Sequence, residues 1–383
     1  YVFRDSSDFD HEKAYNHIHI LNKYRFNDNG TDKEIAKYLF ENGYGERKEI
    51  QKPITIESKI LESNNFDFVA TESETDEYIE QVRNGTFKMG LTTKFKKLDE
   101  HWRFKNGTLV VVNGHDNVGK SVLMWYLATI SAIFHNWKWI IYSNENKTGG
   151  VKKKIIEFYK CKSIKSFSDS ELSEAKKWFD EHFTIIKNTE LFTYKDMIAI
   201  GTKLNEQKKY DAFLIDPYNS LWAETNDRHE YDYKAMTEFR QFISKTGCGI
   251  YLNCHAITEA LRRKYPKEHP RYAGYPMPPD KADTEGGGKF SNKADDFLTL
   301  HRMVQHTEDW KYTEIHVKKI KEMETGGKHT FLEEPVRLQM IAGGCGFEDE
   351  SGYNPILDRT AIQTALVPDR INESNEKEFN PPF

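Results

Sequence analysis

The sequence predicts an α/β protein whose mostly parallel sheet carries helices on both faces. Four short apolar runs are typical of buried parallel strands, which are covered on both sides. They are Leu109–Val112, Trp139–Tyr142, Phe213–Ile215 and Ile250–Asn253. Amphipathic helical patterns separate these runs, as crossover connections between parallel strands require. The helical patterns cover Ser121–Phe134, Glu171–Phe183 and Tyr231–Ile243. Three later segments lack long helices between them, so they are expected to be strands of mixed direction: Phe297–His301, Glu314–Lys318 and Thr330–Leu332.

The chain divides into four predicted segments. They are a small helical appendage at 1–60, an acidic linker at 61–84, the α/β domain at 85–346 and a polar tail at 347–383. In the appendage, Thr31 and Glu34 make a capping box ahead of a helix that ends near Asn42. The linker is poor in large apolar residues, and a short helix is expected around Asp76–Val82.

Composition excludes several classes of protein. A net charge of −5 argues against a general polyanion binder, so any nucleic-acid contact must come from a local basic patch. The four cysteines form no CxxC pair, which argues against a zinc ribbon or a disulfide scaffold and fits a reducing compartment. No apolar run reaches the ~18 residues that a membrane span needs. We therefore expect a cytoplasmic protein (host cytoplasm if viral), with targeting left open because the chain begins at Tyr1.

A phosphate-binding loop follows the first apolar run. Gly114-His-Asp-Asn-Val-Gly-Lys-Ser121 matches G-x4-G-K-[ST], and a long helical pattern comes after it. Glycines let backbone N–H groups face phosphates, and the helix N-terminus adds a favourable dipole. Lys120 is expected to reach the terminal phosphates of ATP (or another NTP), and Ser121 to bind Mg²⁺. The predicted nucleotide contacts here are Gly114, Asn117, Gly119, Lys120 and Ser121. Asp116 is unusual, because a carboxylate in this loop repels phosphate unless it points away.

Three polar residues end the neighbouring apolar runs. Glu145 follows the second run and is placed to polarise a water that attacks the γ-phosphate, although a glutamate at a strand end is often simply solvated. Asp216 ends the third run as in a Walker B strand, and is expected to hold Mg²⁺ through water. His255 ends the fourth run, where it either senses the γ-phosphate by a hydrogen bond or caps the strand.

The connection after His255 is strongly basic. Its cations are Arg262, Arg263, Lys264, Lys267 and Arg271, and its interleaved aromatics are Tyr265, Tyr272 and Tyr275. Positive charge follows phosphates and aromatic rings stack on bases, so single-stranded DNA is the expected ligand. The alternative is a solvated basic loop. A glycine-rich stretch follows, and its predicted DNA contacts are Gly287, Gly288 and Lys289.

Taken in order, these motifs resemble the hexameric replicative helicases of the DnaB type, which include phage primase-helicases and the mitochondrial Twinkle helicase. The resemblance covers roughly Gly85 to Leu338, with a lead-in at Gly90–Trp102 and a specific block at Asp283–Asp295 that closes at Arg302. It implies a RecA-like core, ATP hydrolysis at subunit interfaces and a ring, expected to be a hexamer, around single-stranded DNA. It also implies that the linker helix docks on a neighbouring subunit, with a primase or polymerase as a candidate partner.

The resemblance also assigns two lysines near the end of the domain. The family carries K-Q-R-N-G-x-T-G, and the matching run here begins Lys319-Ile-Lys321. Both lysines are thereby expected to reach the neighbouring subunit's nucleotide, with Lys321 in the arginine-finger position. Lysine lacks the planar fork that binds phosphate oxygens bidentately, so a slower enzyme or a finger from elsewhere is expected. Together with Asp116 this indicates a divergent member, and leaves open a RecA- or KaiC-like ATPase or a catalytically weak loader.

Overall fold

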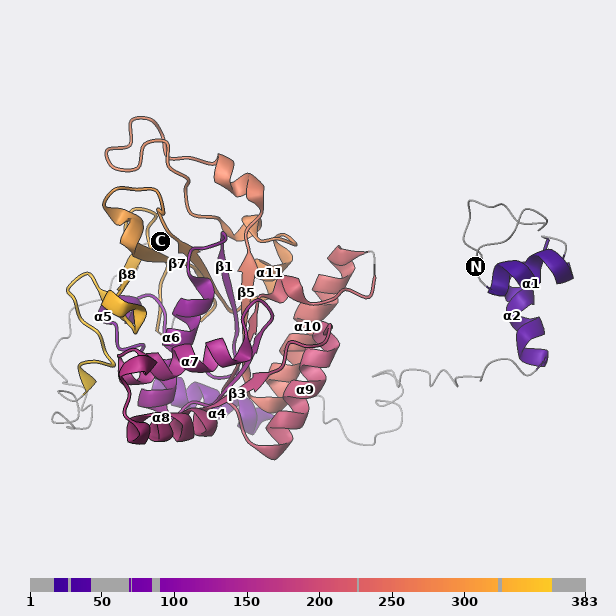
Figure 1. Ribbon diagram of the computed structural model, residues 1–383, viewed down its shortest axis with the longest axis horizontal. Coiled ribbons are helices and arrows are strands. Elements are labelled where there is room, and N and C mark those ends of the chain that lie inside the picture. The colour runs from indigo at the N-terminus through magenta and orange to yellow at the C-terminus, as the bar shows by residue number, and fades with distance from the viewer. Residues whose placement is uncertain are drawn as a thin grey trace. The chain divides into compact units, whose positions relative to one another are not determined.

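The structure is a computed structural model that describes residues 17–26, 29–42, 69, 71–84, 90–225, 227–322 and 326–359 (Figure 1). Its residues separate into two compact units, Tyr1–Glu80 and Gln81–Phe383. No helix among the described residues is long and apolar enough to cross a membrane.

The described part of the first unit includes a helical hairpin. Its helices are α1 (His17–Phe26) and α2 (Asp32–Glu41). The predicted capping box is confirmed, because the backbone N–H of Thr31 donates to the Glu34 carboxylate at 2.9 Å and the reciprocal bond is 3.4 Å. Phe26 meets Tyr38 edge-on with ring centroids 5.9 Å apart, and Ile35 is buried. Helix α4 (Glu72–Arg83) lies in the predicted linker and begins four residues before the expected one.

The second unit is built on a nine-stranded sheet in the order β3-β2-β4-β5-β1-β6-β7-β8-β9, counted over the described residues. The strands are β1 (Leu109–Gly114), β2 (Trp139–Ser143), β3 (Phe183–Ile186), β4 (Ala212–Asp216), β5 (Gly249–His255), β6 (Asp296–His301), β7 (Tyr312–Ile320), β8 (Val336–Met340) and β9 (Phe347–Asp349). Neighbours from β3 to β6 are parallel, and β7, β8 and β9 add on antiparallel. The predicted α/β class with a mostly parallel sheet is confirmed.

Helices cover both faces of this sheet. They are α5 (Lys96–Asp99), α6 (Lys120–His135), α7 (Thr148–Lys160), α8 (Asp169–His182), α9 (Tyr194–Gln207), α10 (Arg228–Thr246) and α11 (Lys289–Lys293). Figure 1 shows α6 and α7 on one side of β1 and β5, with α9 and α10 on the other. Side chains of β1 alternate between two apolar cores: Val110 and Val112 pack with α6, α7 and α8, whereas Leu109 and Val111 pack with α9 and α10. The fully apolar strand pattern therefore has its origin in burial from both sides.

Two predicted strand assignments need correction. Strand β3 was missed because it continues directly from α8, so its first residue, Phe183, also completes the apolar pattern of the helix. The strand predicted at Thr330–Leu332 is wrong: Phe331 is 74% exposed there, and strand β8 starts later, at Val336.

The α/β domain also extends past the predicted boundary at residue 346. Strand β9 pairs with β8, and Phe347 is buried against the ring of Tyr126 at a centroid distance of 5.3 Å. The Tyr126 hydroxyl donates to the Phe347 carbonyl and to Asn354, both at 3.0 Å, and Ile356 joins the core. The predicted tail at 347–383 thus begins inside the domain, and residues 360–383 lie outside the described part of the chain.

Truncating Phe347 to alanine is expected to destabilise the domain by about 3–5 kcal/mol, because a fully buried aromatic side chain leaves a cavity. Urea unfolding measures the change in the free energy of unfolding. Leu357→Ala is the matched control, since Leu357 is 57% exposed. Equal unfolding midpoints for the two variants would show that β9 is not part of the core.

Candidate nucleotide-binding site

The candidate site lies at the carboxyl ends of the central parallel strands. Strand β1 sits between β5 and β6, while the chain leaves it for β2 on the far side of β4 and β5. Such a switch in strand order opens a crevice at the sheet edge, where open α/β sheets bind ligands. A cleft of about 750 Å³ occupies this position, and its lining includes Asp116, Lys120, Ser121, Glu145, Asp216 and His255. The structure therefore brings together seven of the predicted site residues: Asn117, Gly119, Lys120, Ser121, Glu145, Asp216 and His255.

The phosphate loop needs glycine for two different reasons. A side chain at Gly114 would place its Cβ 2.6 Å from the Leu300 carbonyl oxygen, so this residue lets β6 approach closely. Gly119 takes a left-handed conformation with φ of 89° immediately before α6. The Nζ of Lys120 donates to the carbonyls of Gly114 and His115, at 2.7 and 2.8 Å. Burial removes water from the Lys120 ammonium group and lowers its pKa. Phosphate oxygens that replaced these carbonyls would therefore bind a poorly hydrated cation.

Asp216 and Ser121 make the part of the cleft that fits a metal ion. The Ser121 hydroxyl donates to Asp216 Oδ1 at 3.0 Å, and the Asn253 amide donates to the same oxygen at 2.7 Å. Asp216 Oδ2 is buried without a hydrogen-bond partner among the described residues. Burial raises the pKa of Asp216. A buried carboxylate oxygen beside a hydroxyl suits a hydrated Mg²⁺, which takes few protein ligands and keeps several waters.

The imidazole of His255 lies between two carboxylates at the mouth of the cleft. Its Nε2 is 3.5 Å from Glu145 Oε1, and its Nδ1 is 2.8 Å from Asp116 Oδ1. Asp116 therefore turns toward His255, a partner that the sequence did not indicate. Glu145 keeps 57% of its side chain exposed, so a water molecule can reach its carboxylate.

Asn188 is a site residue that sequence reasoning missed. Its side-chain amide donates to three carbonyls in the loop that carries Glu145: those of Ser143, Asn144 and Asn146, at 3.2, 3.0 and 3.2 Å. Asn188 follows β3, and β3 pairs with β2, so the sheet brings together residues that lie more than forty positions apart. With β3 unpredicted, no sequence signal pointed to this amide.

A smaller pocket of about 280 Å³ adjoins the cleft and shares Asp116, Ala256 and Thr258 with it. Apolar side chains such as Val118 and Met303 line it. His301 also lines it, and neither ring nitrogen of His301 has a hydrogen-bond partner among the described residues. Burial lowers the pKa of His301 to about 4, so this ring is neutral at physiological pH.

The sequence of this chain is distantly similar to that of a known protein. No protein-family model matches the chain. A Twinkle homolog protein, chloroplastic/mitochondrial, from Arabidopsis thaliana is 27% identical over 257 residues, which cover 62% of this chain and 33% of that protein. The chain is distantly similar to this Twinkle homolog in sequence and to DnaB-like ATPase domains in its RecA-like fold. It spans about a third of the length of this relative.

Solved structures share the fold of this RecA-like domain. One of them, an isolated ATPase domain, superposes with a TM-score of 0.58 at 13% identity, covering 73% of this chain and 98% of that one. A DnaB-like replicative helicase, whose structure was described with its interactions with primase, gives a TM-score of 0.55 at 16% identity, covering 82% of this chain and 74% of that one.

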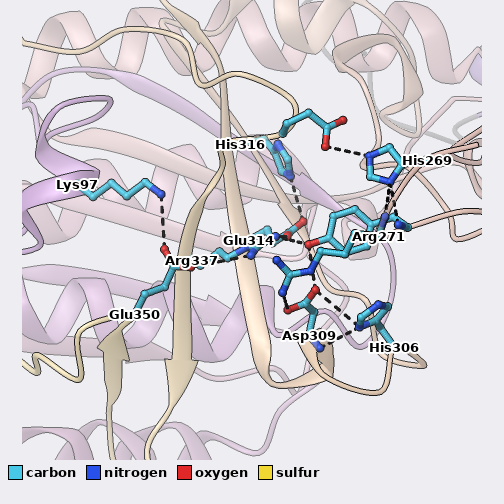
Figure 2. A network of polar contacts seen from close by, with 11 residues as sticks. Lys97, His269, Arg271, His306, Asp309, Glu314, His316, Arg337 and Glu350 are labelled. Carbon is cyan, nitrogen blue, oxygen red and sulfur yellow. Dashed lines mark hydrogen bonds and ion pairs between the residues drawn. The ribbon is translucent and has the colours of Figure 1, made fainter.

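The basic loop of the RecA-like domain is only partly available to a ligand. Arg263 pairs with Asp283, and Arg271 pairs with Asp309 at 2.6 Å. Figure 2 shows Arg271 against Asp309, beside the pair formed by Arg337 and Glu314. The exposed cations of the loop with no ion pair among the described residues are Arg262, Lys264 and Lys267.

The predicted stacking role is wrong for two of the three tyrosines. Tyr265 and Tyr272 are buried in a small apolar cluster with Met303. The Tyr272 hydroxyl donates to Asp309 at 3.0 Å and accepts a hydrogen bond from Arg337. Tyr272 therefore anchors the loop to Asp309 and to Arg337 of β8, and cannot stack on a base.

The glycine-rich stretch is tied to His255, and its lysine points inward. Lys289 is buried with its Nζ 3.3 Å from an Asp232 carboxylate oxygen, which corrects its assignment as a DNA contact. The backbone N–H of Glu285 donates to the His255 carbonyl at 2.8 Å. Asn219 bridges the same two residues, because it accepts from the His255 N–H and donates to the Glu285 carboxylate, both at 3.0 Å. Gly287 and Gly288 follow Glu285 on the same loop, with open space where a side chain would stand.

Lys319 and Lys321 lie at the opposite end of the strands from the cleft. Strand β7 runs antiparallel to β6, so Ile320 pairs with Asp296 at the start of β6, whereas His301 ends β6 beside the phosphate loop. These ends are separated by about 16 Å at the usual strand rise. Lys321 is half exposed and lies 3.3 Å from Asp295. Lys319 donates to the carbonyls of Ser291 and Ala294 at 2.7 Å, so its predicted phosphate contact would require it to leave these partners.

Proposed function

We propose that the chain is an ATP-dependent DNA helicase that works as a ring, expected to be a hexamer, with nucleotide sites between subunits. One observation carries the proposal: the cleft holds the phosphate, metal and water-activating groups, but no arginine lines it among the described residues. The half-exposed Lys321 lies at the end of the strands that is far from the cleft. A neighbouring subunit that presents this end would supply the missing cation.

Five residues of the cleft have defined roles in the proposed reaction. Lys120 binds the terminal phosphates, while Ser121 and Asp216 hold Mg²⁺, which would neutralise charge on the phosphates. Glu145 accepts the proton of the attacking water, and His255 donates a hydrogen bond to the γ-phosphate. The adjoining pocket, apolar with a neutral imidazole, suits a nucleobase.

Mixing two inactive variants tests the shared site. Lys321→Ala chains combined with Glu145→Gln chains are expected to recover part of the activity that each variant lacks alone, because a site that joins Glu145 of one chain to Lys321 of the other is complete. Steady-state hydrolysis across a titration of the mixture measures this. Lys321→Arg is the control, expected to keep or modestly raise activity because it restores a planar fork.

No recovery of activity at any mixing ratio would mean that each subunit hydrolyses ATP alone. Open filaments in negative-stain images, in place of closed rings, would instead favour a RecA-like strand-exchange protein. A primase or polymerase as a partner remains a prediction.

The exposed cations of the basic loop give a test of DNA binding. Replacing Arg262, Lys264 and Lys267 by alanine is expected to preserve basal hydrolysis, because none of them lines the cleft. It should abolish stimulation by single-stranded DNA. The slope of log affinity against log salt should flatten by roughly 2, at about 0.7 per phosphate on a single strand.

Lys165, Lys176 and Lys177 are the matched control, since they are equally charged and exposed, and precede or lie on α8. An unchanged salt slope with normal unwinding would show that the loop is a solvated face. The DNA contact would then have to be sought at the backbone of Gly287 and Gly288.

A further inference from the structure

The carboxylate of Asp116 is the most unusual feature of the phosphate loop. A negative charge there opposes the binding of phosphates, yet the side chain lines the cleft and lies 2.8 Å from Nδ1 of His255. That nitrogen is buried, and it has no aligned hydrogen-bond partner among the described residues. The Asp116 side chain is 81% exposed, so it has room to turn and complete the bond. Asp116 is therefore placed to control the imidazole.

The remaining contacts of His255 leave only its ring free to turn. Its backbone N–H and carbonyl are held by Asn219 and by the Glu285 N–H. Its Nε2 faces Glu145 at 3.5 Å, which is longer than a hydrogen bond between well-placed groups. Asp116 is thus the side chain placed to fix the direction of the ring from the Nδ1 side. With both ring nitrogens protonated, Nδ1–H donates to Asp116 and Nε2–H is the donor presented to the cleft.

We propose that Asp116 is a positioning residue that orients His255 toward the terminal phosphate and the attacking water. This inference rests on the proposed ATPase function and adds a residue to it. The charge of Asp116 weakens nucleotide binding, while its oxygen fixes the ring that distinguishes a triphosphate from a diphosphate. Asparagine keeps the acceptor oxygen but removes the charge, and alanine removes both.

The comparison between Asp116→Asn and Asp116→Ala therefore separates the effect of orienting the His255 ring from the effect of the Asp116 charge. Both variants are expected to bind ATP about fivefold more tightly than wild type, since both lose a negative charge near the phosphates. The asparagine variant should keep its kcat close to wild type. The alanine variant should lose about 10-fold in kcat, because a misdirected ring misplaces the reacting groups. Glu259→Ala is the control: it removes an exposed carboxylate from the next loop without touching His255.

Equilibrium binding of ATP and ADP supplies a readout that does not depend on turnover. The preference for ATP over ADP should be about fivefold greater in the asparagine variant than in the alanine variant. This factor corresponds to the net contribution of one oriented hydrogen bond. If wild type binds ATP without hydrolysing it, the proposed function fails while this comparison still tests Asp116. Indistinguishable kcat values and ATP preferences for the two variants would overturn the inference.

Discussion

Replacing Glu145 by glutamine is expected to slow ATP turnover at least ~100-fold, which is the usual contribution of a positioned general base. Glutamine keeps the shape of the side chain but cannot accept a proton from water. Nucleotide and Mg²⁺ binding should persist, because Lys120, Ser121 and Asp216 do not depend on this side chain. Steady-state hydrolysis and equilibrium binding of an ATP analogue measure the two effects separately.

Glu190→Gln serves as the control for the glutamate change. This exposed residue follows Asn188 at the same edge of the sheet but does not line the cleft. If Glu145→Gln hydrolyses ATP at the wild-type rate, another group activates the water and the assignment of Glu145 is wrong.

Lys120→Ala is expected to fail at an earlier step and to weaken ATP binding by about 100-fold, since charge-assisted hydrogen bonds to phosphate are lost. The ammonium already lies inside the loop, bonded to the Gly114 and His115 carbonyls, and no other lysine or arginine among the described residues lines the cleft to replace it. Fluorescent nucleotide titration measures the loss, and thermal unfolding checks that the variant is folded. Normal affinity in a folded variant would place the phosphates elsewhere in the cleft.

Much of the site could be predicted from the sequence because its main residues end apolar strands. Gly114, Asp216 and His255 all stand at the carboxyl ends of such strands, and parallel strands bring these ends to one edge. The chemistry of each residue type then suggested its role. Strand β3 was hidden for a related reason, because its apolar residues extend the pattern of the preceding helix without a break.

The rest depends on packing between segments that are distant in the chain. Nothing near Lys289 indicated that its ammonium would be buried against Asp232, and the basic loop did not show that Tyr272 would join an ion-pair network with Asp309 and Arg337. Asp116 is unfavourable for phosphate binding in the sequence alone, which does not show that His255 lies beside it. Charge counts along the sequence therefore overstated how many basic residues are free to bind DNA.

ATP hydrolysis measured with and without single-stranded DNA, on size-fractionated protein, tests the central claim most directly. We expect the hydrolytic activity to elute with a ring-sized species, to rise when single-stranded DNA is added, and to be absent from the monomer fraction. Hydrolysis by the monomer at a rate that single-stranded DNA leaves unchanged would contradict the central claim.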